Sequence, residues 1–480
     1  MDSQVAATHL LVGDGRGLVT NAILKHEAGT ISAIDTAPAG HASAHSLVMP
    51  AFVNAHDHAR LAGAAIGSCD LPLETVLPRS GFGAPPDPYL GAAAALARSA
   101  RAGCGAMMVH YTRPSGTMSL IDEAKEIARA ARDVGIRMAF AFAVRDKNPI
   151  VYGDSEGVLS ALKPADRQTI ESLFVRRTMQ PRDYIELTET VSAEIASPLI
   201  DVQFGPAGVQ WCSRPMLEAI AERSATTGRQ VHMHLLETPY QRKWADQEFP
   251  GGIVHYLRDI GLLSERLTVA HCIYAHPGEL ELLAQSGVRI VTNFGSNLHT
   301  YTGLGPIAAA HKCGCGIAVG VDGRAVDEDG DIIREMRIVQ MIHGGTGFDR
   351  TWSREEFLSL TIKNGRRAVG APGVGVLTPG SPADFVTLDM ERLERDVLIP
   401  SDPIQLLFAR GNTSFVKDVT VAGQTIVSDG VLTGIDLPAV EQEFREKYRA
   451  ANAGYSQHWT SWGPFEKAVR EWYKGHVSCE

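Results

Sequence analysis

Residues 50–58 read PAFVNAHDH, an apolar run that ends in two histidines separated by a single residue. Successive side chains of a strand point to opposite faces, so His56 and His58 share one direction and Asp57 takes the other. At the C-terminal end of a barrel strand the shared direction is the barrel mouth, where catalytic groups sit. Two imidazoles in this position suit a divalent metal ion of borderline softness.

Seven further apolar segments follow, each bounded by glycine or polar residues. The eight segments are PAFVNAH (50–56), AMMVHY (106–111), RMAFAFAV (137–144), LIDVQFG (199–205), QVHMHLLE (230–237), LTVAHCIY (267–274), RIVTNFG (289–295) and GIAVGVDG (316–323). Stretches with apolar residues at helical spacing, such as 120–135, 214–228 and 277–287, lie between them. Strands alternating with helices predict a (β/α)8 TIM barrel over residues 50–374. The alternative, an open doubly wound sheet, requires an early glycine-rich phosphate turn, which the sequence lacks.

The two ends of the chain do not show the alternation of strands and helices that the barrel shows. Residues 1–49 and 375–435 contain short β-rich runs, and neither flank is large enough to bury a core alone. We therefore expect them to form one small β-sandwich domain, remote from the metal. Residues 436–480 are predicted to be a helical extension. Its aromatic residues are expected to pack against the body or a partner subunit: Trp459, Trp462, Trp472 and Tyr473.

The composition is that of an ordinary globular protein, with 44% hydrophobic and 21% charged residues. The formal net charge of −10 argues against a nucleic-acid partner. No run reaches the roughly 18 apolar residues that a membrane span needs, and the N-terminus lacks the pattern of a signal peptide. Seven scattered cysteines form no disulfide framework, so we expect a cytoplasmic protein.

Three other strand ends carry groups that bind metals or transfer protons. They are VHMHLLE (231–237), VAHC (269–272) and VGVDG (319–323). His56, His58, a histidine of the fifth strand and Asp322 would supply three nitrogens and one oxygen, with room for water. An open coordination position is typical of a catalytic metal rather than a structural one.

In this order the motifs resemble those of the amidohydrolase superfamily, in its branch of cytosine deaminase, guanine deaminase and atrazine chlorohydrolase-like enzymes. PAFVNAHDH is similar to the first-strand motif of that branch, and LPLETVL (71–77) resembles the segment after it. GVLTPGSPAD (375–384) resembles the return of the chain to the small β-domain. The resemblance therefore covers nearly the whole chain.

The resemblance implies a role for each matched residue. HLLET implies that His234 binds the metal and that Glu237 shuttles protons, and AHC implies that His271 contacts the attacking water and the substrate. The implied metal ligands are His56, His58, His234 and Asp322. The implied catalytic residues are Glu237, His271 and Asp322. We expect one divalent metal ion as the cofactor, with zinc first and iron or manganese as alternatives.

Substrate contacts are less well defined by these motifs. A Ser-Asn pair matches the branch, Trp211 could stack on a flat ring, and arginines lie near predicted strand ends. The predicted substrate contacts are Trp211, Ser296, Asn297, Arg113 and Arg324. Arg60 and Arg145 are further cations near strand ends. His232 is expected to be a hydrogen-bonded core residue, and both a structural and a functional role for His110 stay open.

These assignments predict hydrolysis of a small molecule. The first hypothesis is hydrolytic deamination of an amino-substituted nitrogen heterocycle or cyclic amidine, because Glu237 can protonate a leaving amine. The second is hydrolysis of a cyclic amide, N-alkylamine, carbamate or chloro substituent at the same metal. A catalytically inactive scaffold ranks last, since the chain keeps every implied ligand. We also expect a homo-oligomer, a dimer or higher.

Overall fold

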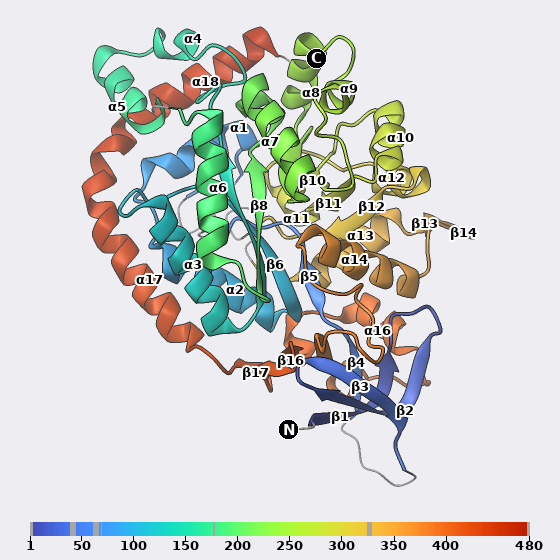
Figure 1. Ribbon diagram of the computed structural model, residues 1–480. Coiled ribbons are helices and arrows are strands. Elements are labelled where there is room, and N and C mark those ends of the chain that lie inside the picture. The colour runs from blue at the N-terminus through green and yellow to red at the C-terminus, as the bar shows by residue number, and fades with distance from the viewer. Residues whose placement is uncertain are drawn as a thin grey trace.

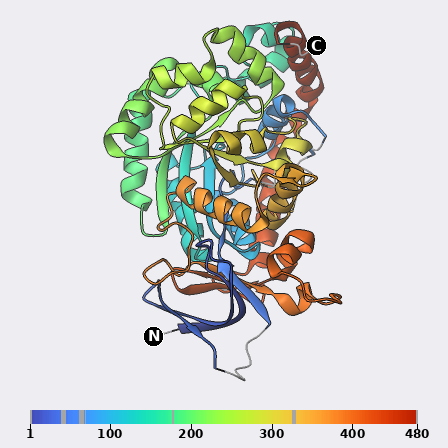
Figure 2. The ribbon, with the colours of Figure 1, turned by 90° about the vertical axis from the view of Figure 1, so that its right-hand side faces the viewer.

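The computed structural model describes residues 3–38, 45–60, 67–68, 70–175, 178–323 and 329–477. Two eight-stranded sheets dominate it, together with a small hairpin of β13 (Gly345–Thr346) and β14 (Asp349–Arg350). Helices surround the sheet drawn in the middle of Figure 1. The second sheet lies below it, next to the N-terminus, and the side view in Figure 2 shows the same separation.

The first sheet is the predicted barrel, and its strands run in chain order. They are β5 (Phe52–Asn54), β6 (Cys104–Tyr111), β7 (Arg137–Val144), β8 (Ile200–Pro206), β9 (Val231–Leu235), β10 (Leu267–His271), β11 (Arg289–Thr292) and β12 (Gly316–Val319). All neighbouring pairs are parallel. Backbone hydrogen bonds from Ala55 to Val319 (3.0 Å) and from Asp322 to His56 (2.9 Å) join the first strand to the eighth. The (β/α)8 prediction is confirmed.

Helices follow the strands on the outside of the barrel and over its mouth. They are α1 (Leu73–Arg79), η2 (Ser80–Phe82), α2 (Pro88–Arg101), α3 (Leu120–Val134), α4 (Glu156–Leu159), α5 (Pro164–Phe174), α6 (Pro181–Ile195), η3 (Val209–Trp211), α7 (Arg214–Thr227), α8 (Pro239–Glu248), α9 (Ile253–Asp259), α10 (Pro277–Gln285), α11 (Phe294–His299), α12 (Ile307–Cys313), α13 (Ile332–His343) and α14 (Arg354–Ala368). In the described ranges, no helix is both long and apolar enough to cross a membrane.

Helix α3 illustrates how the sequence sets these boundaries. The Ser119 hydroxyl accepts a hydrogen bond from the backbone of Asp122, which caps the first turn. Gly135 ends the helix with φ 82°, a conformation that costs glycine little. Between the caps, apolar residues at helical spacing are buried, so the helix packs one face on the barrel.

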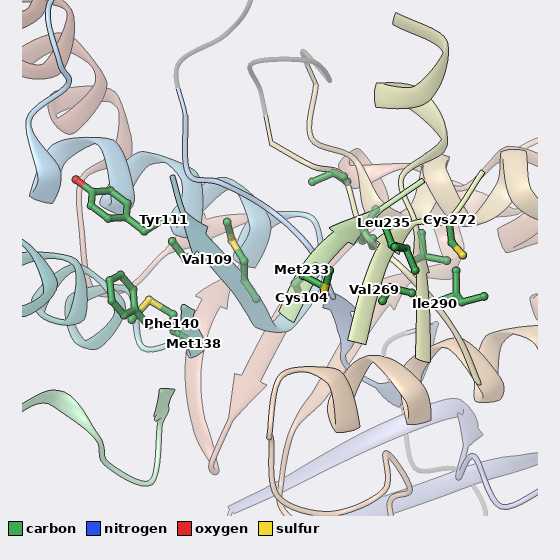
Figure 3. Close-up of a cluster of buried hydrophobic side chains, with 14 of the residues drawn as sticks. Cys104, Val109, Tyr111, Met138, Phe140, Met233, Leu235, Val269, Cys272 and Ile290 are labelled. Atoms are coloured by element: carbon green, nitrogen blue, oxygen red, sulfur yellow. The ribbon is translucent and has the colours of Figure 1, made fainter. Parts of the chain in front are cut away.

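Alternation along β9 separates the barrel interior from the surrounding core. Met233 and Leu235 belong to the apolar cluster that joins strands to helices, together with Val269 of β10 (Figure 3). His232 and His234 alternate with them and therefore point the other way, into the barrel. All five side chains are buried.

The second sheet combines strands from both ends of the chain, as predicted. Its order is β18 (Val431–Leu432), β17 (Gln424–Ser428), β16 (Val416–Val421), β15 (Phe385–Asp389), β4 (Ser46–Pro50), β1 (Ser3–Leu11), β2 (Leu18–Glu27) and β3 (Thr30–Thr36). The two flanks meet where β4 pairs antiparallel with β15. Between β15 and β16 the chain also forms α15 (Met390–Leu393), α16 (Pro403–Arg410) and η4 (Thr413–Phe415).

The C-terminal residues form α17 (Leu437–Asn452), η5 (Ala453–Ser461) and α18 (Trp462–His476). In Figure 1 this red segment runs from the second sheet along the side of the barrel to its far end. Phe465 is fully buried, and its ring lies 5.9 Å from that of Phe82. Trp472 and Tyr473 are 8% and 5% exposed. The aromatic residues of the tail thus pack against the body of the protein.

A buried ion cluster joins the barrel to the second sheet. Asp384 accepts hydrogen bonds from Arg137 of β7 (2.8 Å) and Arg366 of α14 (2.8 Å), and from the backbone of Ala422 (2.7 Å). Burial raises the pKa of Asp384, but the hydrogen bond from Arg137 and the charges of both arginines lower it below its usual value. The carboxylate is therefore held ionised between the two units.

We expect Asp384→Ala to lower the free energy of unfolding by about 3–5 kcal/mol, because it leaves two buried guanidinium groups without their partner. Denaturant unfolding measures this change. Glu218→Ala is the matched control: it removes the exposed partner of Arg214 and should cost no more than about 1 kcal/mol. A loss at Asp384 as small as that of the control would contradict the assignment.

Candidate active site

Four side chains from two strand ends, those of β5 and β9, and from the loop after β12 converge at the barrel mouth. Asp322 Oδ1 lies 3.1 Å from Nε2 of His56 and 3.1 Å from Nε2 of His58. Nε2 of His234 lies 3.2 Å from Nε2 of His58. Four ligands at tetrahedral positions about 2.0–2.1 Å from a zinc ion would be about 3.3–3.4 Å apart, so the spacing fits such an ion.

Hydrogen bonds to the other ring nitrogens fix the orientation of these histidines. Nδ1 of His58 lies 2.6 Å from the carbonyl oxygen of His110, and Nδ1 of His234 lies 2.6 Å from that of Ala207. A carbonyl only accepts, so Nδ1 carries the proton in both rings. The two Nε2 lone pairs then face each other, which is repulsive without a cation between them. This is the arrangement by which proteins prepare histidine to bind a metal.

Buried polar atoms without partners mark the same point. Within the described part of the chain, His56 Nε2, Asp322 Oδ1 and His271 Nε2 are buried and accept or donate no hydrogen bond. Such atoms are costly unless a ligand satisfies them. Together, His56, His58, His234 and Asp322 could hold a divalent metal, and a second possible group, formed by Glu237, His271 and Asp322, shares the aspartate.

Burial and charge set the protonation states that a metal needs. Burial lowers the pKa of His58 to about 3 and keeps the pKa of His234 well below its usual value, so both rings are neutral. For Asp322, burial raises the pKa, but the rings of His56 and His58, whose Nε2 atoms lie 3.1 Å from Oδ1, bring it well below the ordinary value. Neutral imidazoles and an ionised carboxylate are the forms that bind metals.

The two other predicted catalytic groups stand beside this cluster. His271 Nε2 lies 3.6 Å from Oε1 of Glu237, and both side chains are almost fully buried. Burial raises the pKa of Glu237 to about 7, against the opposing charge of His271. A carboxyl group with this pKa can both donate and accept a proton near neutral pH.

The backbone leaves regular strand geometry at these positions. Strict alternation would point His271 in the direction of Val269, which packs toward the helices (Figure 3). His271 instead has φ 69°, and Asp322 has φ 60°. Positive φ is unusual for residues other than glycine and costs energy, and such strain gathers at functional sites.

Ser296 and Asn297, predicted as substrate contacts, bond to the catalytic groups. The Ser296 hydroxyl donates to Asp322 Oδ2 at 2.5 Å, and Asn297 Oδ1 lies 2.8 Å from His271 Nδ1. Both are buried, and neither is among the residues that line the cavities described next. Similarly, His232 Nε2 lies 2.8 Å from His56 Nδ1, in agreement with its expected place as a hydrogen-bonded core residue.

Two cavities meet above the cluster. A small inner cavity of about 20 Å³ reaches His58, His234, Glu237 and Asp322. A vestibule of about 530 Å³ lies outside it. The residues that line both are Arg60, Leu77, Arg145 and Trp211. Substrate would therefore pass these four side chains on its way to the metal ligands.

The remaining predicted substrate contacts differ in position. Trp211 is at the junction of the two cavities, but the guanidinium of Arg145 covers its ring at 4.1 Å. Arg113 lines the vestibule, and its Nη2 donates to the carbonyl oxygen of Gly83 at 2.8 Å. Arg324 lies outside the described residues. His110 is buried, with Nε2 3.3 Å from the carbonyl oxygen of Gly205.

Part of the site was not anticipated. Tyr455, His458 and Tyr473 of the C-terminal segment line the vestibule together with Glu74 of α1. Glu74 accepts hydrogen bonds from the hydroxyls of Tyr152 (3.1 Å) and Thr238 (2.7 Å), and burial raises its pKa. The only sequence signal was the aromatic content of the tail, which does not indicate which surface the aromatic residues cover.

A family model described as "Amidohydrolase family" matches residues 47–426, most of the chain. The chain belongs to the amidohydrolase family. The membership inferred from the strand-end motifs is thereby confirmed. In this amidohydrolase, the matched range begins in β4 and ends in β17, so it includes the whole barrel and part of the second sheet.

Proteins similar to this amidohydrolase include named deaminases. A 5-methylthioadenosine/S-adenosylhomocysteine deaminase of Nitratidesulfovibrio vulgaris is 27% identical over 90% of this chain and 94% of its own. A 5'-deoxyadenosine deaminase of Methanosarcina barkeri is 26% identical, over 83% and 85%.

Solved structures give the same fold. An adenosine deaminase from Xanthomonas campestris with bound zinc has a TM-score of 0.77 at 22% identity, over 93% of this chain and 98% of that one. An atrazine chlorohydrolase from Arthrobacter aurescens complexed with zinc has a TM-score of 0.76 at 21% identity, over 93% and 99%. At these identities the likeness establishes the fold of the amidohydrolase and no more.

Proposed function

We propose that this protein is a metal-dependent hydrolase that deaminates an amino-substituted nitrogen heterocycle, such as the adenine ring of an adenosine derivative. The observation that carries the proposal is the convergence of three Nε2 atoms and Asp322 Oδ1 beside a buried carboxyl group, Glu237. The names of the similar proteins support ammonia as the leaving group, because these proteins are named as deaminases of adenosine derivatives.

The side chains divide the reaction between them. A divalent ion held by His56, His58, His234 and Asp322 would polarise a water and lower its pKa to about 7. Asp322 would accept the proton of the attacking water. Glu237 would protonate a ring nitrogen and would then pass the proton held by Asp322 to the departing amine. The hydroxyl proton of the adduct would return to Glu237 as the carbonyl group forms.

His271 has a distinct task in this scheme. Its Nδ1 is bound to Asn297, which leaves Nε2 free to hydrogen-bond the attacking water or the charge that develops on the substrate. The Ser296 hydroxyl orients Asp322 by donating a hydrogen bond to its Oδ2 atom. We therefore assign Ser296 and Asn297 positioning roles and keep Trp211, Arg113 and Arg324 as proposed substrate contacts.

Ammonia release across a panel of heterocycles tests the proposal. Adenosine derivatives, cytosine, guanine and aminotriazines form the panel, and matched chloro, N-alkylamino and cyclic amide compounds represent the alternative reaction. We expect turnover of at least one amino compound. Turnover restricted to the alternative compounds would instead favour hydrolysis of another leaving group at the same site.

We predict one metal ion per chain, with zinc as the first candidate. Neither β7 nor β8 contains a lysine that could bridge a second ion, and Asp201 of β8 packs against Gly370 and accepts from Gln203. Elemental analysis of the purified protein should give about one equivalent. Two equivalents would contradict this prediction, and the group of Glu237, His271 and Asp322 would then be the first candidate for the second ion.

The remaining expectations extend this proposal. We propose a cytoplasmic homo-oligomer, with domains at 1–49 with 375–435, 50–374 and 436–480. Five described cysteines are free, in keeping with a reducing compartment. Light scattering on the purified protein gives the oligomeric state.

A further inference from the structure

Two arginines stand at the junction between the vestibule and the inner cavity. Arg60 follows the metal-ligand motif after β5, and Arg145 follows β7 directly. Arg60 donates from Nη2 to the hydroxyl of Thr112, and Arg145 stacks on Trp211. Among the residues that the structure describes, no carboxylate lies within ion-pair distance of either guanidinium. Neither cation therefore has a partner of opposite charge there.

The two arginines differ in how far water reaches them. The Nε atom of Arg60 is buried and has no hydrogen-bond partner among the described residues. Burial and the charge of Arg60 lower the pKa of Arg145 to about 10, but Arg145 is exposed to the vestibule, so water screens much of this effect. Two like charges held together in a partly desolvated cavity are stabilised by an anion that binds between them.

The acids of the metal site do not account for both arginines. Asp322, Asp57 and Glu237 attract Arg60 and raise its pKa, against the larger effect of burial. Asp57 is already bound by Asn54 and by the backbone of Ala59. Asp322 faces the metal position.

Glu237 raises the pKa of Arg145 less than Tyr152 or Cys212 does. Glu237 is neutral whenever it holds the proton that the proposed reaction requires. Arg145 is therefore the clearer of the two binding groups.

We propose that Arg60 and Arg145 form a subsite for a carboxylate carried by the heterocyclic substrate, which rests on the proposed deamination. Guanidinium groups are planar forks that bind a carboxylate through paired hydrogen bonds. The Arg145 guanidinium lies over the Trp211 ring at 4.1 Å, and both side chains line the inner cavity. Because both arginines also line the inner cavity, an anion held by them places the attached ring toward Glu237 and the metal ligands.

Matched acid and amide pairs test the subsite by binding alone. The probes are 9-carboxymethyladenine and 9-carbamoylmethyladenine, with the equivalent pairs on cytosine and guanine, titrated calorimetrically into zinc-loaded protein. We expect at least one acid to bind ten-fold or more tightly than its amide. Arg145→Met should reduce that preference to about one-fold and leave the affinity for the amide unchanged. Arg60→Met should do the same, with an unchanged zinc content.

Arg214→Met is the control, because it removes an equal charge from the exposed surface of α7 and should keep the preference. The subsite is overturned if every acid binds as tightly as its amide, or if no acid binds. It is also overturned if the preference for the acid survives in the variant that carries both Arg60→Met and Arg145→Met. Tighter binding of 9-phosphonomethyladenine than of the carboxylate would overturn the assignment to carboxylates. If the preference holds while no compound releases ammonia, the subsite stands and the proposed deamination fails.

Discussion

Glu237→Gln should reduce turnover by about 10²–10⁴-fold while the protein keeps its full metal content. The amide has nearly the same shape as the acid, but it cannot donate a proton and take it back. Glu237 also stands 3.6 Å from His271 and is not one of the four converging ligands, so its replacement leaves the metal set intact. Steady-state ammonia release and elemental analysis on one preparation measure both quantities.

The control for this variant is Glu222→Gln, which changes an exposed carboxylate of α7 in the same way. Its activity should match the unmodified protein. Near-full activity of Glu237→Gln on the true substrate would mean that the leaving group needs no proton from this residue. Hydrolysis of a chloro substituent, which leaves as an anion, would then become the better assignment.

His234→Ala should abolish both metal binding and turnover. It removes one of the three nitrogens and leaves the carbonyl oxygen of Ala207 with only the hydrogen bond from the backbone N–H of residue 234. Substitutions of groups that merely support a ligand cost about 10–100-fold in metal affinity, so loss of a ligand itself should cost more. Metal titration of the apoprotein measures the affinity.

His255→Ala serves as the matched control, because His255 is exposed on α9, and should bind metal normally. The two variants are also expected to differ from each other. Glu237→Gln loses turnover with the metal present, whereas His234→Ala loses both. If His234→Ala bound metal as tightly as the unmodified protein, the proposed ligand set would be wrong.

The barrel and the metal set were predictable because both depend on local patterns. Each barrel strand is a short apolar run bounded by glycine or polar residues, and alternation alone places His56 and His58 on one face. His271 is different, since alternation along β10 would point it with Val269 toward the helices. Its assignment came from the motif resemblance, and a left-handed backbone at the strand end explains why the periodicity fails there.

The vestibule was not predictable from any single segment. Arg145, Trp211 and Tyr473 meet only because three distant parts of the chain fold over the mouth, and no periodicity relates them. The exact contacts of Ser296 and Asn297 were not predictable from the sequence either. Their motif located them near the site, but the sequence does not distinguish contact with substrate from contact with Asp322 and His271.

The pairing of β4 with β15 has a consequence for synthesis on the ribosome. Phe385 pairs with Pro50, and the intervening residues make up nearly the whole barrel. At about 5–20 residues per second, the strands of the first flank wait on the order of tens of seconds for their neighbour to emerge. During that interval β4 exposes an unpaired edge, which is a template for aggregation. The nascent chain should therefore depend on chaperones until residues beyond β15 have left the exit tunnel.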